Sequence, residues 1–252
     1  MMASAKTLGR NLLHALGWCL WLVFAYFLSA LVVSLLVMVV KDRAGYNLMS
    51  NTFSVAVMQT VQLLLMLSFT ITWPYRVGTY RHQSIAQRRA AKMKAVGLSR
   101  LPKSSDLVPL FQGVVAYYAI GSTLIALASL ILPRDIIDQT QNVGFAVTGN
   151  NWWQLIIIGI ALVIVAPVFE ELLFRGLMFT KLRDNLGAAA AALAISMLFA
   201  IAHGQINVGI TTFALSMVSC WLRHRTGAIW SSIGLHAVSN FIAFFLVYVL
   251  SV

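Results

Sequence analysis

The chain has 252 residues, of which 60% are hydrophobic and only 10% are charged, and its formal net charge is +11. A soluble domain needs far more charge to cover its surface, so this composition excludes an ordinary soluble protein. Both cysteines, Cys19 and Cys220, lie in apolar runs, which excludes a disulfide framework and a Cys-x-x-Cys metal site.

Long apolar runs predict an all-α fold, a polytopic transmembrane helical bundle with about seven spans, because a bilayer core requires about 20 apolar residues per helix. The first run follows Lys6 and Arg10, as in a signal peptide. It is about twice the ~7–15 residues of a signal peptide's apolar region, so we expect it to be retained. The predicted spans are residues 12–40, 53–73, 107–132, 152–180, 188–203, 208–222 and 228–251.

The positive charges predict the orientation of these spans. With the N-terminus in the cytoplasm, fourteen Lys and Arg residues fall on the cytoplasmic side, and three (Lys41, Arg43 and Arg134) fall outside. These residues accompany membrane spans rather than a groove-reading motif, so we expect a lipid bilayer and no nucleic acid as partner. Short loops are typical of a prokaryotic inner membrane. The cytoplasmic set is Lys6, Arg10, Arg76, Arg81, Arg88, Arg89, Lys92, Lys94, Arg100, Lys103, Lys181, Arg183, Arg223 and Arg225.

A polar insertion separates the second and third spans. Within it, the segment from Ser84 to Val96 is rich in Ala, Arg, Lys and Met. This composition predicts a surface helix that lies on anionic lipid, with a solvated loop as the alternative.

The only two glutamates of the chain are adjacent, at Glu170 and Glu171, inside the fourth span. A charge at membrane depth costs at least ~2.5–3.5 kcal/mol, so two charges there indicate a specific structural or functional role. Pro167 predicts a kink or a restart of the helix, which would bring the glutamates near a positive helix end. Glu171 and Arg175 have i,i+4 spacing and can pair, whereas Glu170 points about 100° away. The alternative is that both carboxylates share Arg175.

Two further pairs with i,i+4 spacing follow on later spans. Phe199 and His203 share one helix face, and His236 and Asn240 share another. Taken singly, the two histidines are equally well explained as interhelical hydrogen-bonding groups. The fourth and fifth spans are predicted to form a hairpin that turns near Leu186, and this hairpin favours a shared site over single hydrogen-bonding groups.

Glu170 lies 16 residues before Leu186 and His203 lies 17 residues after it, so both are roughly 25 Å from the turn. His236 is only ~12 Å inside the start of the last span, so its depth agrees if the hairpin tip around Lys181 to Asn185 projects about 10 Å into the cytoplasm. A carboxylate, two imidazoles and an amide that meet in one cavity are the groups needed for peptide hydrolysis by water. Glu170 and His203 would then activate the water, and His236 and Asn240 would donate to the oxyanion.

These three motifs resemble the CPBP family, which contains type II CAAX prenyl endopeptidases and Abi-type bacteriocin-processing proteins. They are Glu-Glu-xxx-Arg, Phe-xxx-His and His-xxx-Asn, and they occur in order within residues 152–245. The resemblance implies a glutamate-dependent intramembrane endopeptidase with a cavity open to the cytoplasm. It implies catalytic roles for Glu170, His203, His236 and Asn240, with Glu171, Arg175 and Phe199 as structural support.

The resemblance also implies a division of the chain. Residues 1–106 would form a variable region with two spans and the basic loop, and residues 107–252 would form the catalytic core. A protein or peptide is the expected substrate, and a prenyl group on it stays open, as does the oligomeric state.

Two alternatives remain at this point. One is a non-catalytic membrane regulator, for example of the bacteriocin-immunity type, that binds a partner through the same cavity. The other is a metal-dependent hydrolase or an ion-coupled transporter. We expect no cofactor, because a His-Glu-x-x-His motif is missing, but a glutamate and two histidines are a possible zinc ligand set.

Overall fold

The computed structural model describes residues 5–44, 52–72, 82–139 and 152–250. These ranges are mostly helical, and they contain no strand. The α-helices are α1 (Ala5–Ala44), α2 (Thr52–Leu67), α4 (Ile85–Ala95), α5 (Leu107–Ala128), α6 (Arg134–Ile137), α7 (Trp152–Gly159), α8 (Ala166–Glu171), α9 (Phe179–Leu186), α10 (Ala188–Ala202), α11 (Ile206–Thr226) and α12 (Trp230–Phe244). The short 3₁₀ and π segments are η1 (Ser68–Thr72), η2 (Ser104–Asp106), η3 (Ile160–Val165), η4 (Leu172–Met178) and η5 (Phe245–Val249).

Within the described ranges, six helices are long and apolar enough to cross a membrane, and Ala188–Ala202 is a shorter apolar helix. Each predicted span falls on one of these seven helices, so the polytopic bundle is confirmed and the chain is an integral membrane protein. Large apolar side chains remain exposed on the spans, such as Leu13 at 71% and Phe111 at 70%. Hydrocarbon is the solvent for these side chains. Trp73, Arg76 and Arg81 lie outside the described residues.

The chain divides into two compact units, each assembled from three segments. The first contains Met1–Cys19, Arg89–Gln141 and Glu171–His236, and the second contains Leu20–Arg88, Asn142–Glu170 and Ala237–Val252. The sequence-based division at residue 106 concerned the location of family motifs, and it stays a prediction.

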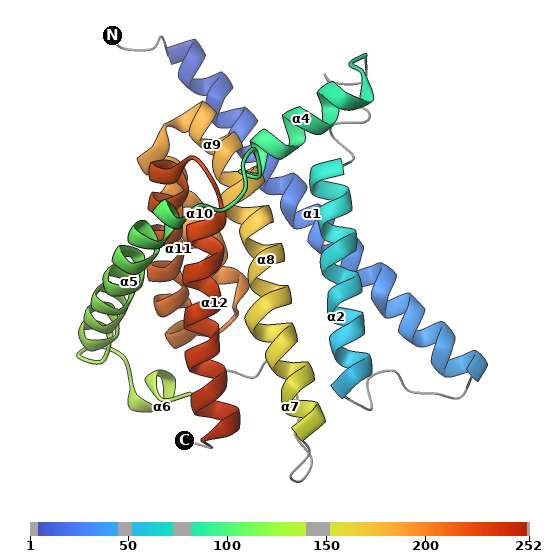
Figure 1. Ribbon diagram of the computed structural model, residues 1–252, viewed down its shortest axis with the longest axis vertical. Helices are drawn as coiled ribbons and strands as arrows, with labels where there is room; N and C mark the ends of the chain where they lie inside the picture. The colour runs from blue at the N-terminus through green and yellow to red at the C-terminus, as the bar shows by residue number, and fades with distance from the viewer. Residues whose placement is uncertain (1–4, 45–51, 73–81, 140–151, 251–252) are drawn as a thin grey trace. The chain divides into compact units, whose positions relative to one another are not determined.

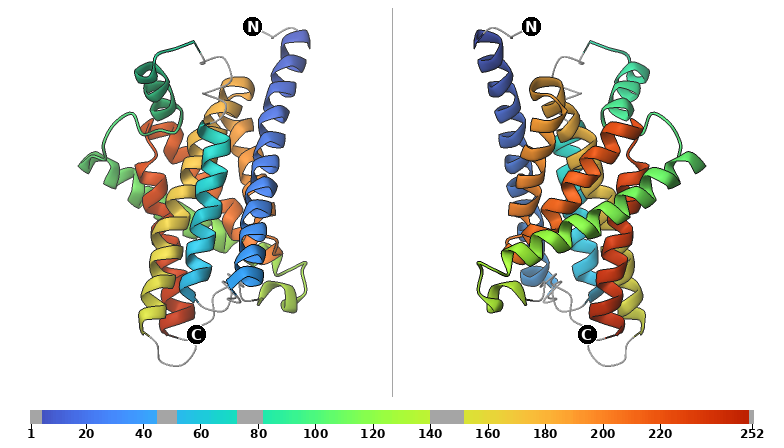
Figure 2. Two further views of the ribbon diagram at one scale, coloured as in Figure 1. Left: turned by 90° about the vertical axis from the view of Figure 1, so that its right-hand side faces the viewer. Right: turned by 90° about the vertical axis from the view of Figure 1, so that its left-hand side faces the viewer.

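In the first unit, α10 and α11 pack closely as an antiparallel pair joined by residues 203–205 (Figure 1). Gly209 makes this approach possible, because a Cβ there would lie 3.3 Å from the carbonyl oxygen of Ala200. Helix α5 crosses α11 obliquely (Figure 2). At this crossing, a Cβ on Gly113 would lie 2.8 Å from a methyl group of Leu222.

The hairpin predicted near Leu186 is confirmed. Helix α9 ends at Leu186, and Gly187, with a φ of 83°, reverses the chain before α10 begins at Ala188. A positive φ is readily adopted by glycine, which has no Cβ.

In the second unit, α2 packs against α7 and η3. Gly159 also allows close packing of the end of α12, because its Cβ position lies 3.3 Å from the ring of Phe244. On α1, the indole N–H of Trp21 donates to the carbonyl of Phe69 over 3.2 Å.

Helix α4 confirms the helix predicted between Ser84 and Val96. It begins with a reciprocal capping box. The Ser84 hydroxyl accepts from the Gln87 N–H over 3.2 Å, and the Gln87 side-chain oxygen accepts from the Ser84 N–H over 2.9 Å.

Candidate active site

Residues 152–186 form one continuous helical segment that carries both glutamates (Figure 1). Two π-helical stretches, η3 and η4, flank α8 within it. Of the kink or restart predicted at Pro167, the restart is therefore wrong, and the kink stays a prediction. The helix continues because η3 shifts the hydrogen-bond register just before the proline. Without a restart, no helix N-terminus lies beside Glu170.

Asn240 compensates for the N–H that Pro167 lacks. In the π register of η3, the Ala166 N–H donates to the carbonyl of Ala161, five residues earlier. The next donor in this register would be residue 167, and its acceptor would be Leu162. Proline has no N–H to donate. The side-chain amide of Asn240 donates to the Leu162 carbonyl instead, over 2.8 Å.

Glu171 and Arg175 form the ion pair predicted from their spacing. The guanidinium lies 2.9 Å from Glu171 Oε1, and both side chains are fully buried. A buried ion pair is strongly destabilised when one partner is removed, because the other charge is left uncompensated.

His236 adds a third group to this pair. Its Nδ1 lies 3.0 Å from Glu171 Oε1, although the two residues are 65 positions apart in the sequence. A carboxylate oxygen accepts the hydrogen bond, so Nδ1 carries the proton. His236 thus contacts the glutamate that was predicted to be structural.

Phe199 lies at the centre of this cluster in the first unit. The Arg175 guanidinium lies 4.3 Å from the centroid of the Phe199 ring, in a cation–π arrangement. The ring meets those of Phe174, His203 and His236 edge-on, at centroid distances of 4.9, 4.8 and 5.9 Å. These are packing contacts, and the supporting role that the resemblance implies for Phe199 stays a prediction. Phe174, which was not identified from the sequence, belongs to the same cluster.

His203 is the residue that ends α10. Its Nδ1 lies 2.7 Å from the carbonyl oxygen of Phe199. A carbonyl can only accept, so Nδ1 carries the proton, and in the neutral ring Nε2 is the acceptor nitrogen. The backbone therefore fixes the tautomer that a general base requires.

Glu170 is the last residue of the second unit's middle segment. It is half-buried, whereas its neighbour Glu171 is fully buried. The two carboxylates therefore have different environments, as their angular separation on a helix predicts.

The described residues contain no group of three or more His, Cys, Asp or Glu side chains that could hold a metal ion.

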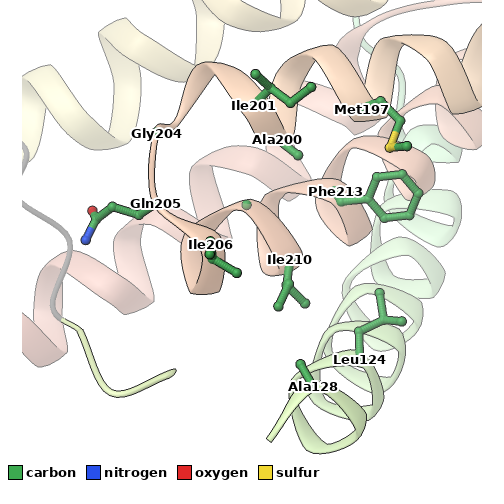
Figure 3. Close-up of a pocket in the computed structure, with 11 residues that line it drawn as sticks. Leu124, Ala128, Met197, Ala200, Ile201, Gly204, Gln205, Ile206, Ile210 and Phe213 are labelled. Atoms are coloured by element: carbon green, nitrogen blue, oxygen red, sulfur yellow. The ribbon is translucent and has the colours of Figure 1, made fainter. Parts of the chain in front are cut away.

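A separate apolar pocket of about 600 Å³ lies between α5, α10 and the start of α11 (Figure 3). Gln205 is its one polar side chain among lining residues such as Leu124, Met197, Ile201, Ile210 and Phe213. His203 is not among the lining residues, although Gly204 and Ala200 are. The pocket therefore adjoins the turn that carries His203 but contains no catalytic group.

Comparisons with known proteins agree with the three motifs. Residues 151–242 match the family model described as "Type II CAAX prenyl endopeptidase Rce1-like". The chain is also similar to a Bacillus subtilis (strain 168) protein named "Putative membrane peptidase YdiL", with 31% identity over 77 residues. That alignment covers 31% of this chain and 32% of the relative, about a third of its length. No solved structure matches the chain. The two matches support the CPBP family for this protein.

Proposed function

Taking the CPBP family as the premise, we propose that this protein is an intramembrane endopeptidase that hydrolyses a peptide bond with water activated by Glu170 and His203. The one observation that carries the proposal is the extent of the family match. Residues 151–242 include all seven candidate site residues, on three different helices.

The proposed reaction begins with a water molecule that Glu170 and His203 both activate. Glu170 takes a proton from the water while the water oxygen attacks the scissile carbonyl carbon. His203 accepts a hydrogen bond from the same water through Nε2. Collapse of the tetrahedral intermediate breaks the C–N bond, and the proton held by Glu170 passes to the leaving amine. A carboxylic acid and an amine are the products.

His236 and Asn240 would stabilise the oxyanion. Asn240 has a second amide N–H in addition to the one that meets Leu162. His236 would donate through Nε2, which requires both ring nitrogens to carry protons, because Nδ1 already donates to Glu171. Glu171 and Arg175 would hold His236 in place rather than act on the substrate.

The apolar pocket supports a hydrophobic substrate. A groove without charged lining residues can hold a hydrocarbon chain, and about 600 Å³ is a typical size for a small-molecule site. The matching family model names prenyl endopeptidases. We therefore propose a membrane-embedded or lipid-anchored protein or peptide as the substrate.

Cleavage of a lipid-anchored peptide by the purified protein tests the function. Glu170→Gln keeps the shape of the side chain but removes the proton acceptor, so activity should fall by ~10²–10⁴-fold. Glu171→Gln is the matched control one residue away. It should lower thermal stability through the loss of the Arg175 pair and retain some turnover.

Unimpaired cleavage by a folded Glu170→Gln protein would contradict the glutamate mechanism. Cleavage is also measured in the presence of a chelator, which distinguishes the glutamate mechanism from a metal mechanism. Inhibition by the chelator that zinc reverses would assign the reaction to a metal.

A further inference from the structure

The segment from Ala95 to Asp106, here called the strap, joins basic helix α4 to α5 (Figure 1). It is hydrogen-bonded to two other helices of the first unit, α9 and α12, and to the turn before α12. Its backbone carbonyls accept hydrogen bonds from side chains or amides on α9, on α12 and on the turn before it. These bonds run from Thr180 to Ala95 over 2.9 Å, from Ile229 to Gly97 over 3.1 Å, from Trp230 to Arg100 over 2.9 Å, and from Ser231 to Asp106 over 3.1 Å.

Hydrogen bonds within the strap also join its middle to its C-terminal end. Arg100 donates to Asp106 Oδ2 over 2.7 Å, and this bond raises the pKa of the Arg100 guanidinium above its usual value. The Asp106 carboxylate accepts a second bond from the Lys103 N–H over 2.9 Å. The strap is therefore an ordered segment.

The strap contacts the helix of the candidate site at Gly176. A Cβ on Gly176 would lie 2.9 Å from the carbonyl oxygen of Val96, which is closer than real Cβ contacts. Gly176 directly follows Arg175, the partner of Glu171. Backbone therefore packs on backbone beside the buried ion pair, and a displacement of Val96 must move the helix that carries it.

Helix α4 presents a strongly basic surface next to the strap. It carries Arg88, Arg89, Lys92 and Lys94 within eleven residues, and the sequence has no acidic residue between Asp42 and Asp106. Arg89 and Lys94 are exposed, and so is the apolar side chain of Ile85, at 79%. Basic and apolar side chains on one exposed helix suit the headgroup layer of an anionic membrane.

The position of α4 in the chain also favours lipid over a soluble polyanion. It lies between two membrane spans, one ending at Ile71 and the next beginning at Ser104. A helix tethered this closely on both sides stays near the bilayer surface.

We propose that α4 docks on anionic phospholipid headgroups and that the strap transmits docking to the Glu171–Arg175 pair through the Val96–Gly176 contact, which the bond from Thr180 to Ala95 holds together. Docking stands on its own observations, while the effect on catalysis rests on the proposed function. The phosphate groups are the ligand, and the four basic side chains are the binding surface.

Hydrogen exchange of the full chain in nanodiscs tests both parts without an activity assay. Phosphatidylcholine discs are compared with discs that also contain phosphatidylglycerol. Anionic lipid should slow exchange of the α4 amides by about tenfold, because each basic residue near the surface adds to the attraction. The amides of Leu172–Met178 should slow with them.

Two pairs of variants localise the effect. Arg89→Gln/Lys94→Gln should abolish the response in α4 to anionic lipid, whereas Arg183→Gln/Arg225→Gln, with the same loss of charge elsewhere, should retain it. Thr180→Val removes the bond to Ala95 and should uncouple Leu172–Met178 from α4. Its control, Thr123→Val, removes a hydroxyl that bonds only within α5, to Ala119 over 2.7 Å.

Equal exchange in the two lipids, or an unchanged response in Arg89→Gln/Lys94→Gln, overturns docking. Protection of α4 by RNA in phosphatidylcholine discs, without protection by anionic lipid, assigns the surface to nucleic acid and also overturns it. A response of Leu172–Met178 that survives Thr180→Val overturns the coupling. If the unmodified protein cleaves no peptide but shows the expected hydrogen-exchange responses, only the proposed function is contradicted.

Discussion

The side-chain amide of Asn240 donates to the backbone carbonyl of Leu162 over 2.8 Å. This bond occupies the place of a backbone bond that Pro167 cannot form in the π register of η3. Asn240 therefore stabilises the helix at Pro167, three residues before Glu170, in addition to its proposed role at the oxyanion. The two roles can be separated by experiment.

We predict that Asn240→Ala lowers the free energy of unfolding by about 1–3 kcal/mol, because it leaves a part-buried carbonyl without a donor. In a Pro167→Ala background, the new N–H at residue 167 can serve the Leu162 carbonyl, so the same substitution should cost much less. Thermal unfolding of the four proteins of this double-mutant cycle measures the coupling.

Cleavage should not follow stability in this cycle. If Asn240 also donates to the oxyanion, the double variant regains stability but stays impaired in turnover. Equal stability costs in both backgrounds would show that the bond to Leu162 does not serve the proline site.

We predict that Arg175→Ala destabilises the protein by about 3–5 kcal/mol, because it leaves Glu171 buried without its ion-pair partner. Folded yield and melting temperature in detergent measure this loss. The control is Arg183→Ala, whose ion pair with Asp184 is solvent-exposed and should contribute only about 0–1 kcal/mol. A stable but inactive Arg175→Ala protein would instead assign the arginine to catalysis.

We predict that His203 in its neutral form carries its proton on Nδ1, because Nδ1 donates to the Phe199 carbonyl. The ¹⁵N spectrum of protein labelled at histidine distinguishes the tautomers, and His203→Ala assigns the signal. In a neutral ring protonated on Nε2, the acceptor nitrogen would be Nδ1, which faces the Phe199 carbonyl, and this tautomer would contradict the proposed role of His203.

We predict that the N-terminus is cytoplasmic and the carboxyl end is outside, from the fourteen-to-three distribution of positive charges. Reporter fusions after Ser99 and after Val252 should report opposite sides of the membrane. A fusion in the turn at Gly187 should agree with the one after Ser99. The same side for Ser99 and Val252 would refute this topology.

Local patterns predicted much of the fold. Apolar run lengths placed the spans, and i,i+4 spacing predicted both the Glu171–Arg175 pair and the contact between Phe199 and His203. Within the first unit, the hairpin at Gly187 brings together two residues at nearly equal distances from its turn. Phe174 and Phe199 lie 13 residues before and 12 residues after Gly187, and their rings are in contact.

The remaining features depend on contacts between distant segments. The bond from His236 to Glu171 joins residues 65 positions apart, and no local periodicity contains it. The restart expected at Pro167 failed because a distant amide, that of Asn240, satisfies the carbonyl that the proline leaves without a donor. The position of Glu170 relative to His203 stays a prediction.

The i,i+4 spacing of Glu171 and Arg175 also affects how this helix enters the membrane during synthesis. Both charges belong to one helix, so they can neutralise each other as soon as that turn forms, before any other span is present. An unpaired charge would add at least ~2.5–3.5 kcal/mol to insertion. The translocon therefore receives a segment in which this pair is already neutral, and His236 and Phe199 join the pair only when the later helices assemble.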